Sequence, residues 1–495
     1  MSVGPKEIEA CLTVLSALVE DRAALAKVDL ETRNALLTAA GRLSRPERNE
    51  QRLLARALRR QRKHQTRDAD ERTLARAGIR ELREQPVFIT PSPALLEATM
   101  LPPDDRELLD PRICYVCKEP FSRVHFFYDQ LCGPCGDFNF EKRGQTADLR
   151  GRVALITGAR VKIGYQAAIL LLRAGARVIV STRFPKDAAA RYAREPDFES
   201  FAHRLVIHGL DLRHTPSVEA FVRHLEHTES RLDFVLHNAC QTVRRPAGFY
   251  EHLMVRERAP LGSLPEAERG VLSEYDAFVA SSGPTLAGSP AEPAAHSAAE
   301  LSQLPVSPED SRASRALFPA GRLDADLQQV DLRDVNSWRL ALHQVSTVEL
   351  LEVQLVNAIA PFVLNARLKP LMLRQPSRDK HIVNVSAMEG QFYRRFKTDK
   401  HPHTNMAKAA LNMMTRTSAS DYARDGIHMN SVDTGWVTDE DPAHIAIRKT
   451  RENGFQPPLD IVDGAARIVD PIFHGFNTGE HRYGLFLKDY RPAPW

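Results

Sequence analysis

The chain has 495 residues, a length typical of two to four folded units rather than one. Its 43% hydrophobic and 26% charged residues are ordinary for a globular protein, and a formal net charge of +4 gives no chain-wide reason to bind nucleic acid or membrane. No run of 18 or more apolar residues occurs, so we expect no membrane-spanning helix. The N-terminal stretch has acidic residues within its apolar run and no small-residue cleavage site. It therefore predicts an amphipathic helix rather than a signal peptide, and we expect a cytoplasmic protein.

Residues 1–86 are rich in Leu, Ala, Arg and Glu, with apolar residues such as Ile8 and Leu12 at helical spacing. Pro46 stands where one helix should end and the next begin, so this region predicts a helical hairpin or bundle. Residues 52–67 hold seven basic side chains and no acid. We interpret them as a solvated helix face, with a phosphate-binding or partner-binding face as the alternative. No aromatic residue interleaves with the arginines, which argues against nucleic acid, so a protein partner is the expectation for these helices.

A Pro-punctuated linker is predicted for residues 87–110, followed by a small module at residues 111–145. The module contains C-x2-C, a gap of fourteen residues, and a second C-x2-C. Four thiolates at this spacing suit tetrahedral Zn²⁺ in a zinc-ribbon-like or treble-clef module. The alternative is a thioredoxin-type redox pair at the second C-x2-C, which would leave the first pair without a role. The predicted zinc ligands are Cys114, Cys117, Cys132 and Cys135.

From residue 149 to the end, short β-branched runs alternate with longer helical stretches. This alternation predicts βαβ units and an α/β fold with a doubly wound parallel sheet. Residues 241–329 do not fit, because they are rich in Ala, Ser, Pro and Glu. We expect most of this insertion to be disordered, with an ordered surface subdomain as the alternative. The predicted strands are 153–157, 177–182, 205–212, 232–239, 381–387, 427–433 and 483–488.

The strongest motif lies where the first of these strands ends. Thr157 closes a buried strand, Gly158 opens a tight turn, and Gly164 starts a helix whose N-terminus can face a pyrophosphate. A second strand follows about twenty residues later, which is the context that makes a glycine motif specific for dinucleotides.

These residues resemble the T-G-x-x-x-G-x-G signature of the short-chain dehydrogenase/reductase family, with Lys162 in place of the middle glycine. His237-Asn238-Ala239-Cys240 is similar to the family's N-N-A-G. The resemblance implies a Rossmann fold, an NADP or NAD cofactor, and a small carbonyl or alcohol substrate. It also implies a homodimer. The cofactor-binding residues that it implies are Thr157, Gly158, Lys162, Ile163, Gly164, Arg183, Asp211, Leu212, Asn238, Lys408, Gly435 and Thr438.

The end of the second predicted strand indicates which cofactor is preferred. NAD-specific enzymes carry an acid there, whereas this chain has Ser181-Thr182-Arg183. A carboxylate would repel a 2′-phosphate, while Arg183 and Thr182 could bind one, so we expect NADP(H). A surface arginine without a ligand is the alternative for Arg183.

The segment 401–416 resembles the family's Y-x-x-x-K helix, with Lys408 on the lysine and Thr404 on the tyrosine. A threonine hydroxyl is too weak an acid to replace that phenol. The proton could come from Tyr393, His401 or His403, or from water or a substrate group, or the domain could bind nucleotide without turnover. The serine slot falls on Ala387, next to Ser386. The predicted catalytic residues are Lys408, Asn357, Ser386, Tyr393 and His403.

Two functions follow from these patterns. The first is an NAD(P)-dependent oxidoreductase acting on an unidentified carbonyl or alcohol. The second is a non-catalytic NADP(H)-binding adaptor or sensor that docks a macromolecule through the zinc module and the basic helix.

Overall fold

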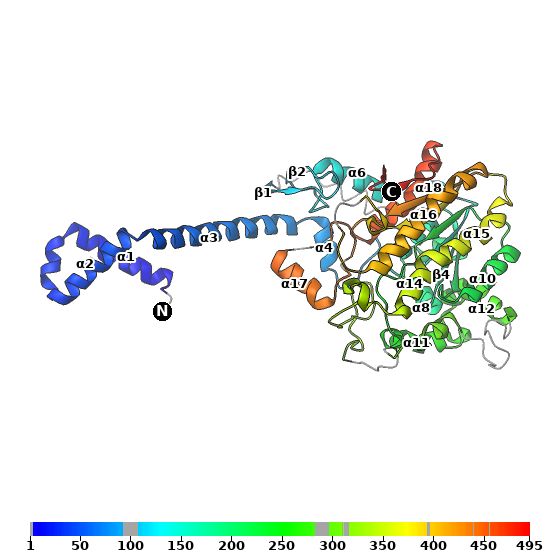
Figure 1. Cartoon of the computed structure of the whole chain (residues 1–495), viewed down its shortest axis with the longest axis horizontal. Helices are drawn as coiled ribbons and strands as arrows, with labels where there is room; N and C mark the ends of the chain where they lie inside the picture. The colour runs from blue at the N-terminus through cyan, green and yellow to red at the C-terminus, as the bar shows by residue number, and fades with distance from the viewer. Residues whose placement is uncertain are drawn as a thin grey trace. The chain divides into compact units, whose positions relative to one another are not determined.

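The computed structural model describes residues 3–92, 107–282, 297–308, 310, 316–393, 397–438, 440–454 and 456–495 (Figure 1). The chain forms two compact units, residues 1–70 and 71–495. The last part of the predicted helical region, residues 71–86, clusters with the second unit. Of the predicted linker, residues 93–106 lie outside the described residues.

The first unit is helical, as predicted. Its helices are α1 (Pro5–Glu20), η1 (Arg22–Lys27), α2 (Leu30–Ser44) and the first part of α3 (Arg48–Ala75). The Asp29 carboxylate caps α2 by accepting a hydrogen bond from the backbone N of Thr32 at 2.8 Å. Pro46 lies between α2 and α3, because its ring stops a helix from continuing. No residue of α1 or α2 is buried.

The second unit contains a sheet in the order β10-β9-β8-β7-β6-β3-β4-β5, parallel except for the β9–β10 pair. From β3 the chain adds β4 and β5 on one side and then returns to add β6 on the other. The topological switch point of this doubly wound sheet therefore lies beyond the carboxyl ends of β3 and β6. The predicted α/β fold is confirmed. The strands are β3 (Val153–Thr157), β4 (Arg177–Thr182), β5 (Leu205–Gly209), β6 (Phe234–His237), β7 (Lys380–Ser386), β8 (Ile427–Asp433), β9 (Phe486–Lys488) and β10 (Arg491–Ala493).

Helices cover both faces of the sheet, and the β3 side chains are buried throughout (Figure 1). One face packs on α7 (Lys162–Arg173), α8 (Pro185–Tyr192) and α18 (Ile461–Thr478). The other packs on α10 (Thr215–Thr228), α15 (Ala360–Leu373) and α16 (Pro402–Arg424). The remaining elements around the sheet are α9 (Phe198–Phe201), η2 (Ala202–Arg204), η6 (Ser337–Arg339), η7 (Leu342–Gln344), α14 (Thr347–Gln354), η8 (Leu355–Ile359), η9 (Met388–Gly390) and α17 (Ala443–Asn453).

The cysteine module belongs to the second unit. It consists of α4 (Gly78–Glu84), the antiparallel pair β1 (Glu107–Ile113) and β2 (Pro120–Arg123), and α6 (Gly133–Arg143). The second cysteine pair opens the helix α6. The module is thus a two-stranded sheet followed by a helix, rather than a ribbon of strands alone.

The prediction of a largely disordered insertion at 241–329 is wrong for its described residues. They form η3 (Ala247–Tyr250), α11 (Glu251–Arg258), η4 (Leu261–Ser263), α12 (Glu266–Ser282) and α13 (Ala298–Ser302). The composition is poor in apolar residues, but those present are placed where they can be buried. Phe249, Leu253 and Phe318 form a small core with Phe184, and Leu272 joins the main core below the sheet.

We expect Leu272→Ala to lower the free energy of unfolding by about 2–5 kcal/mol, the usual cost of a cavity in a packed core. Leu272 is only 1% exposed. The measurement is urea unfolding followed by circular dichroism. Leu304→Ala, which removes the same atoms from a 48% exposed site in the same insertion, should change the free energy by no more than about 0.5 kcal/mol. If neither variant changed the free energy of unfolding, the insertion would not fold onto the sheet.

One helical stretch bears on the prediction that the chain has no membrane-spanning helix. Among the described residues, Thr347–Leu373 is long and apolar enough to cross a membrane by length and composition. Its apolar character has another explanation, because the same stretch packs on α10 and α16 and buries Glu352 and Asn365. Other apolar side chains on it, including Ile359 and Phe362, are exposed.

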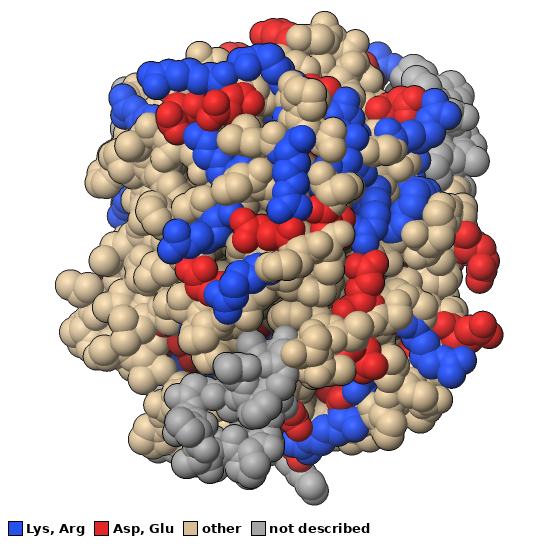
Figure 2. Space-filling view, turned by 90° about the vertical axis from the view of Figure 1, so that its right-hand side faces the viewer, with Lys and Arg blue, Asp and Glu red and all other residues tan. Residues whose placement is uncertain are grey.

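The surface charge is mixed, as the small net charge suggests. On the face shown in Figure 2, basic and acidic side chains are interspersed rather than gathered into a region of one sign. This distribution gives no reason on that face to expect a polyanionic partner.

Candidate cofactor cleft and active site

The turn between β3 and α7 brings backbone segments very close together. A Cβ on Gly158, where φ is +70°, would lie 2.7 Å from the Cα of Ala239, and one on Gly164 would lie 2.2 Å from the Nδ2 of Asn238. Both positions therefore require glycine. Lys162 has a φ of 57°, in the left-handed region that glycine favours, which explains why the family has glycine at this position. The first turn of α7 has no side-chain cap, so its N–H groups remain available to an anion.

A cleft of about 350 Å³ opens beyond the carboxyl ends of β3, β4, β5 and β6. Thr157 lies beneath it, where its Oγ1 accepts a hydrogen bond from the backbone N of Ala239 at 3.1 Å. Gly435 and Lys408 are not among the described residues that line it. The predicted cofactor residues that do line it are Gly158, Lys162, Ile163, Gly164, Arg183, Asp211, Leu212, Asn238 and Thr438.

One wall of the cleft is strongly basic. Arg183 donates a hydrogen bond to the hydroxyl of Tyr250 at 2.7 Å, and its guanidinium lies 4.6 Å from the centre of that ring. Among the described residues, no carboxylate lies within ion-pair distance of Arg183. Arg160 and Arg245 line the same cleft, each paired with an aspartate. Burial would raise the pKa of Tyr250, but the arginines, Arg183 first, outweigh burial and lower it. This wall therefore favours an anionic ligand group.

Two further predicted cofactor residues have definite partners. Burial would lower the pKa of Lys162, but nearby carboxylates, chiefly Glu440 and Asp326, outweigh burial and raise it. The ammonium is thus charged at neutral pH. Asp211 forms an ion pair with Arg213 at 2.6 Å, which holds the pKa of this buried carboxyl below its usual value despite burial. Asp211 therefore lines the cleft as an ionised carboxylate that is already paired with Arg213.

Lys408 and Ser386 lie where β7 meets α16. The Lys408 Nζ donates to the carbonyl of Val385 at 2.7 Å, and the side chain is buried. The Ser386 Oγ donates to the Oδ1 of Asn412 at 2.6 Å. Both side chains are therefore held at the same helix–strand junction.

Asn357 lies in η8, a π-helical turn between α14 and α15. Such turns are frequent at functional sites, because they change the direction in which a helix presents a side chain. The Asn357 Oδ1 accepts from the backbone N of Gln241 at 2.7 Å, and its Nδ2 donates to the Gln241 carbonyl at 3.2 Å. Asn357 thereby fixes the turn after β6, which lines the cleft.

The three predicted proton donors lie in different surroundings. His403 is buried, with its Nε2 3.4 Å from the Oε1 of Glu349. His401 is stacked on Trp338 with ring centres 3.8 Å apart, and burial lowers its pKa, so the ring is neutral near pH 7. Tyr393 is 72% exposed. His403 is therefore the candidate that is both enclosed and paired with a carboxylate.

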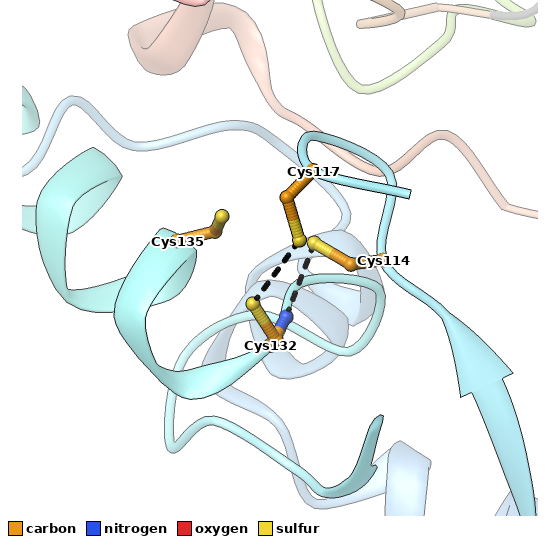
Figure 3. A group of neighbouring side chains, drawn as sticks. All are labelled: Cys114, Cys117, Cys132 and Cys135. Atoms are coloured by element: carbon orange, nitrogen blue, oxygen red, sulfur yellow. Dashed lines mark hydrogen bonds between the residues drawn. The ribbon is translucent and has the colours of Figure 1, made fainter. Parts of the chain in front are cut away.

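The four predicted metal ligands come together, as Figure 3 shows. Their Sγ atoms all lie within 4.8 Å of one another. The Cys117 and Cys132 sulfurs are 3.7 Å apart, close to the ~3.8 Å edge of a tetrahedron with metal–sulfur bonds of about 2.3 Å. Burial would raise the pKa of Cys114, but N–H groups including that of Cys132 outweigh burial and lower it to about 7. Four cysteine sulfurs gathered this closely from two C-x2-C pairs are a donor set that fits a zinc ion.

Comparisons with known proteins identify several that are similar to this chain. Family models described as short chain dehydrogenase and Enoyl-(Acyl carrier protein) reductase match residues 152–255 and 334–455. The uncharacterized protein R665 of Acanthamoeba polyphaga mimivirus is 32% identical over 373 residues, which cover 73% of this chain and 71% of that protein.

Dehydrogenase/reductase SDR family member 13 of Bos taurus is 40% identical over 106 residues, which cover 20% of this chain and 27% of that protein. The structure of carbonyl reductase Sniffer of D. melanogaster has a TM-score of 0.42 at 16% identity, covering 70% of this chain and 100% of that one. The chain belongs to the short-chain dehydrogenase/reductase family.

Within this family, the position that the resemblance assigns to the tyrosine is Thr404. Its hydroxyl is buried in the first turn of α16 and has no hydrogen-bond partner among the described residues. Lys408 follows it by four residues, so the two side chains share one face of the helix. Thr404 and Lys408 thus have the spacing of the family's tyrosine and lysine, and the replacement of the phenol by Thr404 stays a prediction.

Several residues at the cleft were missed by sequence reasoning. Arg245 and Tyr250 come from the insertion, whose composition suggested disorder. Arg160 lies inside the phosphate turn, where a basic residue could have been noticed. Asp433 does not line the cleft but ends β8 opposite Ser386, and burial, with little relief from nearby Lys488, raises its pKa to about 6. Nothing in the sequence distinguishes this aspartate from a solvated one.

Proposed function

We propose that this short-chain dehydrogenase/reductase is an oxidoreductase that uses NADP(H) and acts on a carbonyl or alcohol. The observation that carries the proposal is Arg183, a cation with no carboxylate partner among the described residues, at the switch-point cleft. The charged Lys162 lines the same cleft. A carboxylate at the position of Arg183 would favour ribose hydroxyls, whereas a guanidinium favours a phosphate.

The nicotinamide cofactor, when bound, supplies or accepts the hydride. The chain's own residues bind and orient the reactants. The uncapped start of α7 would hold the pyrophosphate, and Arg183 would hold the 2′-phosphate, with Arg245 nearby in the cleft. Asn357 holds the turn after β6. Lys408, at the position that the resemblance assigns to the family lysine, would assist the proton transfer.

The alternative of a non-catalytic adaptor has less support. It requires the cysteine module to offer a free docking surface, but the buried apolar residues of the module, including Phe121 and Phe127, pack on the segment after β8 of the same unit.

We expect wild-type protein to bind NADPH more tightly than NADH, as isothermal titration calorimetry would measure. Arg183→Ala should weaken NADPH binding by about 1.5–3 kcal/mol, the usual contribution of a hydrogen bond to a charged group, and should hardly change NADH binding. Arg194→Ala, an exposed arginine on the same side of the sheet, is the matched control and should change neither. Equal affinities of the wild type for the two cofactors would contradict the assignment.

A further inference from the structure

The cysteine module and the cofactor cleft share one hydrophobic core. This core, the shared core below, includes Leu108, Cys114, Phe121, Phe127 and Tyr128 from the module and Val437, Leu459, Ile461 and Val462 from the segment after β8. Ile163 of the phosphate turn packs against it. A Cβ on Gly464 would lie 3.0 Å from Ile163 and 3.2 Å from Val437, which shows how tightly these segments fit.

Buried polar contacts fix the module to α18. Arg143, at the end of α6, binds both carboxylate oxygens of Asp460 at 2.6 and 2.7 Å. The hydroxyl of Tyr128 donates to the Oδ1 of Asp463 at 2.6 Å. All four side chains are buried, so the module is held in one orientation on the start of α18.

Tyr115 connects the cysteine cluster to the loop after β8, residues 434–438, which we call the β8 loop. Tyr115 lies between the ligands Cys114 and Cys117, and its own backbone N donates to the carbonyl of Gln130. Its hydroxyl accepts a hydrogen bond from the backbone N of Trp436 at 2.9 Å. A metal bound to Cys114 and Cys117 would therefore close the turn that carries Tyr115, and the Tyr115 side chain holds the β8 loop.

The β8 loop reaches the cleft two residues later. Thr438 lines the cleft, and its hydroxyl donates to Glu440 at 2.8 Å. Glu440 also lines the cleft and is the main carboxylate acting on Lys162. Because Val437 is buried in the shared core, movement of the module would displace Thr438 and Ile163 together.

We propose that Tyr115 is a positioning residue for the dinucleotide, through which metal binding at the four cysteines and cofactor binding in the cleft stabilise each other. The inference rests on the proposed function, since it needs both ligands to bind. It differs from the 2′-phosphate selection by Arg183, because it acts through the β8 loop and should affect NADPH and NADH alike. Linkage requires the effect to be reciprocal, and couplings of this kind are typically about 5–150-fold.

The test uses the full chain purified with zinc and the variant Tyr115→Phe, which keeps the ring and removes the hydroxyl. We expect this variant to retain its zinc and its melting temperature. We expect it to bind NADPH and NADH about fivefold more weakly, by a similar factor for each, as the loss of one hydrogen bond implies. Tyr483→Phe, at a 47% exposed tyrosine, is the control and should bind both as the wild type does.

Trp436 gives a readout that a general loss of stability would not change. It is 45% exposed in the β8 loop and is one of three tryptophans, so Trp436→Phe isolates its emission by difference. Energy transfer from Trp436 to bound NADPH should fall in Tyr115→Phe even at saturating NADPH, because the loop is no longer held. In the reverse direction, saturating NADPH should raise about fivefold the concentration of a competing chelator needed to remove zinc.

The outcomes separate this inference from the proposed function. Wild-type cofactor affinity in zinc-loaded Tyr115→Phe, or zinc retention that is independent of NADPH, would overturn the coupling and leave the NADP(H) assignment intact. Protein that is purified without zinc and still binds NADPH would also overturn the coupling and leave the NADP(H) assignment intact. A wild type that binds neither dinucleotide would overturn both.

Discussion

Cys135→Ser is expected to remove the metal from the chain and to unfold the cysteine module. Wild-type protein purified without chelator should carry about one zinc per chain, measured by plasma mass spectrometry. Structural zinc in small modules contributes on the order of 10 kcal/mol, so losing one of four ligands removes a large part of the module's stability. The shared core contains Cys114 itself, so the loss should extend to the segment after β8. Hydrogen exchange should therefore increase in residues 107–143 and 456–462 before it increases in the sheet.

Cys11→Ser is the matched control, because Cys11 is an exposed free cysteine in the first unit. It should leave zinc content and hydrogen exchange unchanged. Finding no zinc in the wild type would rule out the metal site. A Cys132–Cys135 disulfide that persists under reducing conditions would instead favour the redox pair.

Lys408→Ala is expected to abolish NADPH-dependent reduction of any aldehyde or ketone that the wild type accepts. Lys408 lies in α16 one helical turn after Thr404, at the position that the resemblance assigns to the family's lysine. Lys369→Ala, on the surface of the neighbouring α15, is the control and should retain wild-type activity. Thr404→Val should reduce activity only modestly, because a threonine hydroxyl is too weak an acid to be the donor.

The proton donor should be revealed by a second set of variants. Replacing the true donor among Tyr393, His401 and His403 should cost roughly 10²-fold or more in kcat/KM. His403→Gln is expected to have this effect, because His403 is enclosed and paired with Glu349. The donor acts while it is protonated, so reduction should slow as pH rises through the donor's own pKa, and this fall should come at a higher pH for a tyrosine than for a histidine.

The contrary results are equally specific. Tight NADPH binding, no turnover of any carbonyl and no activation by Thr404→Tyr would move the assignment to the cofactor-binding adaptor. Activation by Thr404→Tyr would show a site that is competent except for its acid. Thr404 is only 3% exposed, so the melting temperature of that variant has to be compared with that of the wild type.

The sequence by itself determined the sheet, the phosphate turn and the cysteine cluster. β3, β4 and β8 match the predicted ranges, because buried parallel strands are short runs that alternate along the chain with longer helical stretches. Gly158 and Gly164 were recognisable because a close backbone approach tolerates only glycine. The four cysteines were recognisable because metal ligands must converge from fixed spacings.

Only the tertiary structure decided the role of the insertion and of the module. Arg245 and Tyr250 come from a segment whose composition suggests disorder, and they face the cleft only because α11 and α12 find an existing hydrophobic surface beside β5. The raised pKa of Asp433 depends on burial, which a sequence does not encode locally. The contact of Tyr115 with Trp436 joins residues 321 positions apart. Local propensity carries no information at that separation, because such contacts are chosen by how the whole core packs.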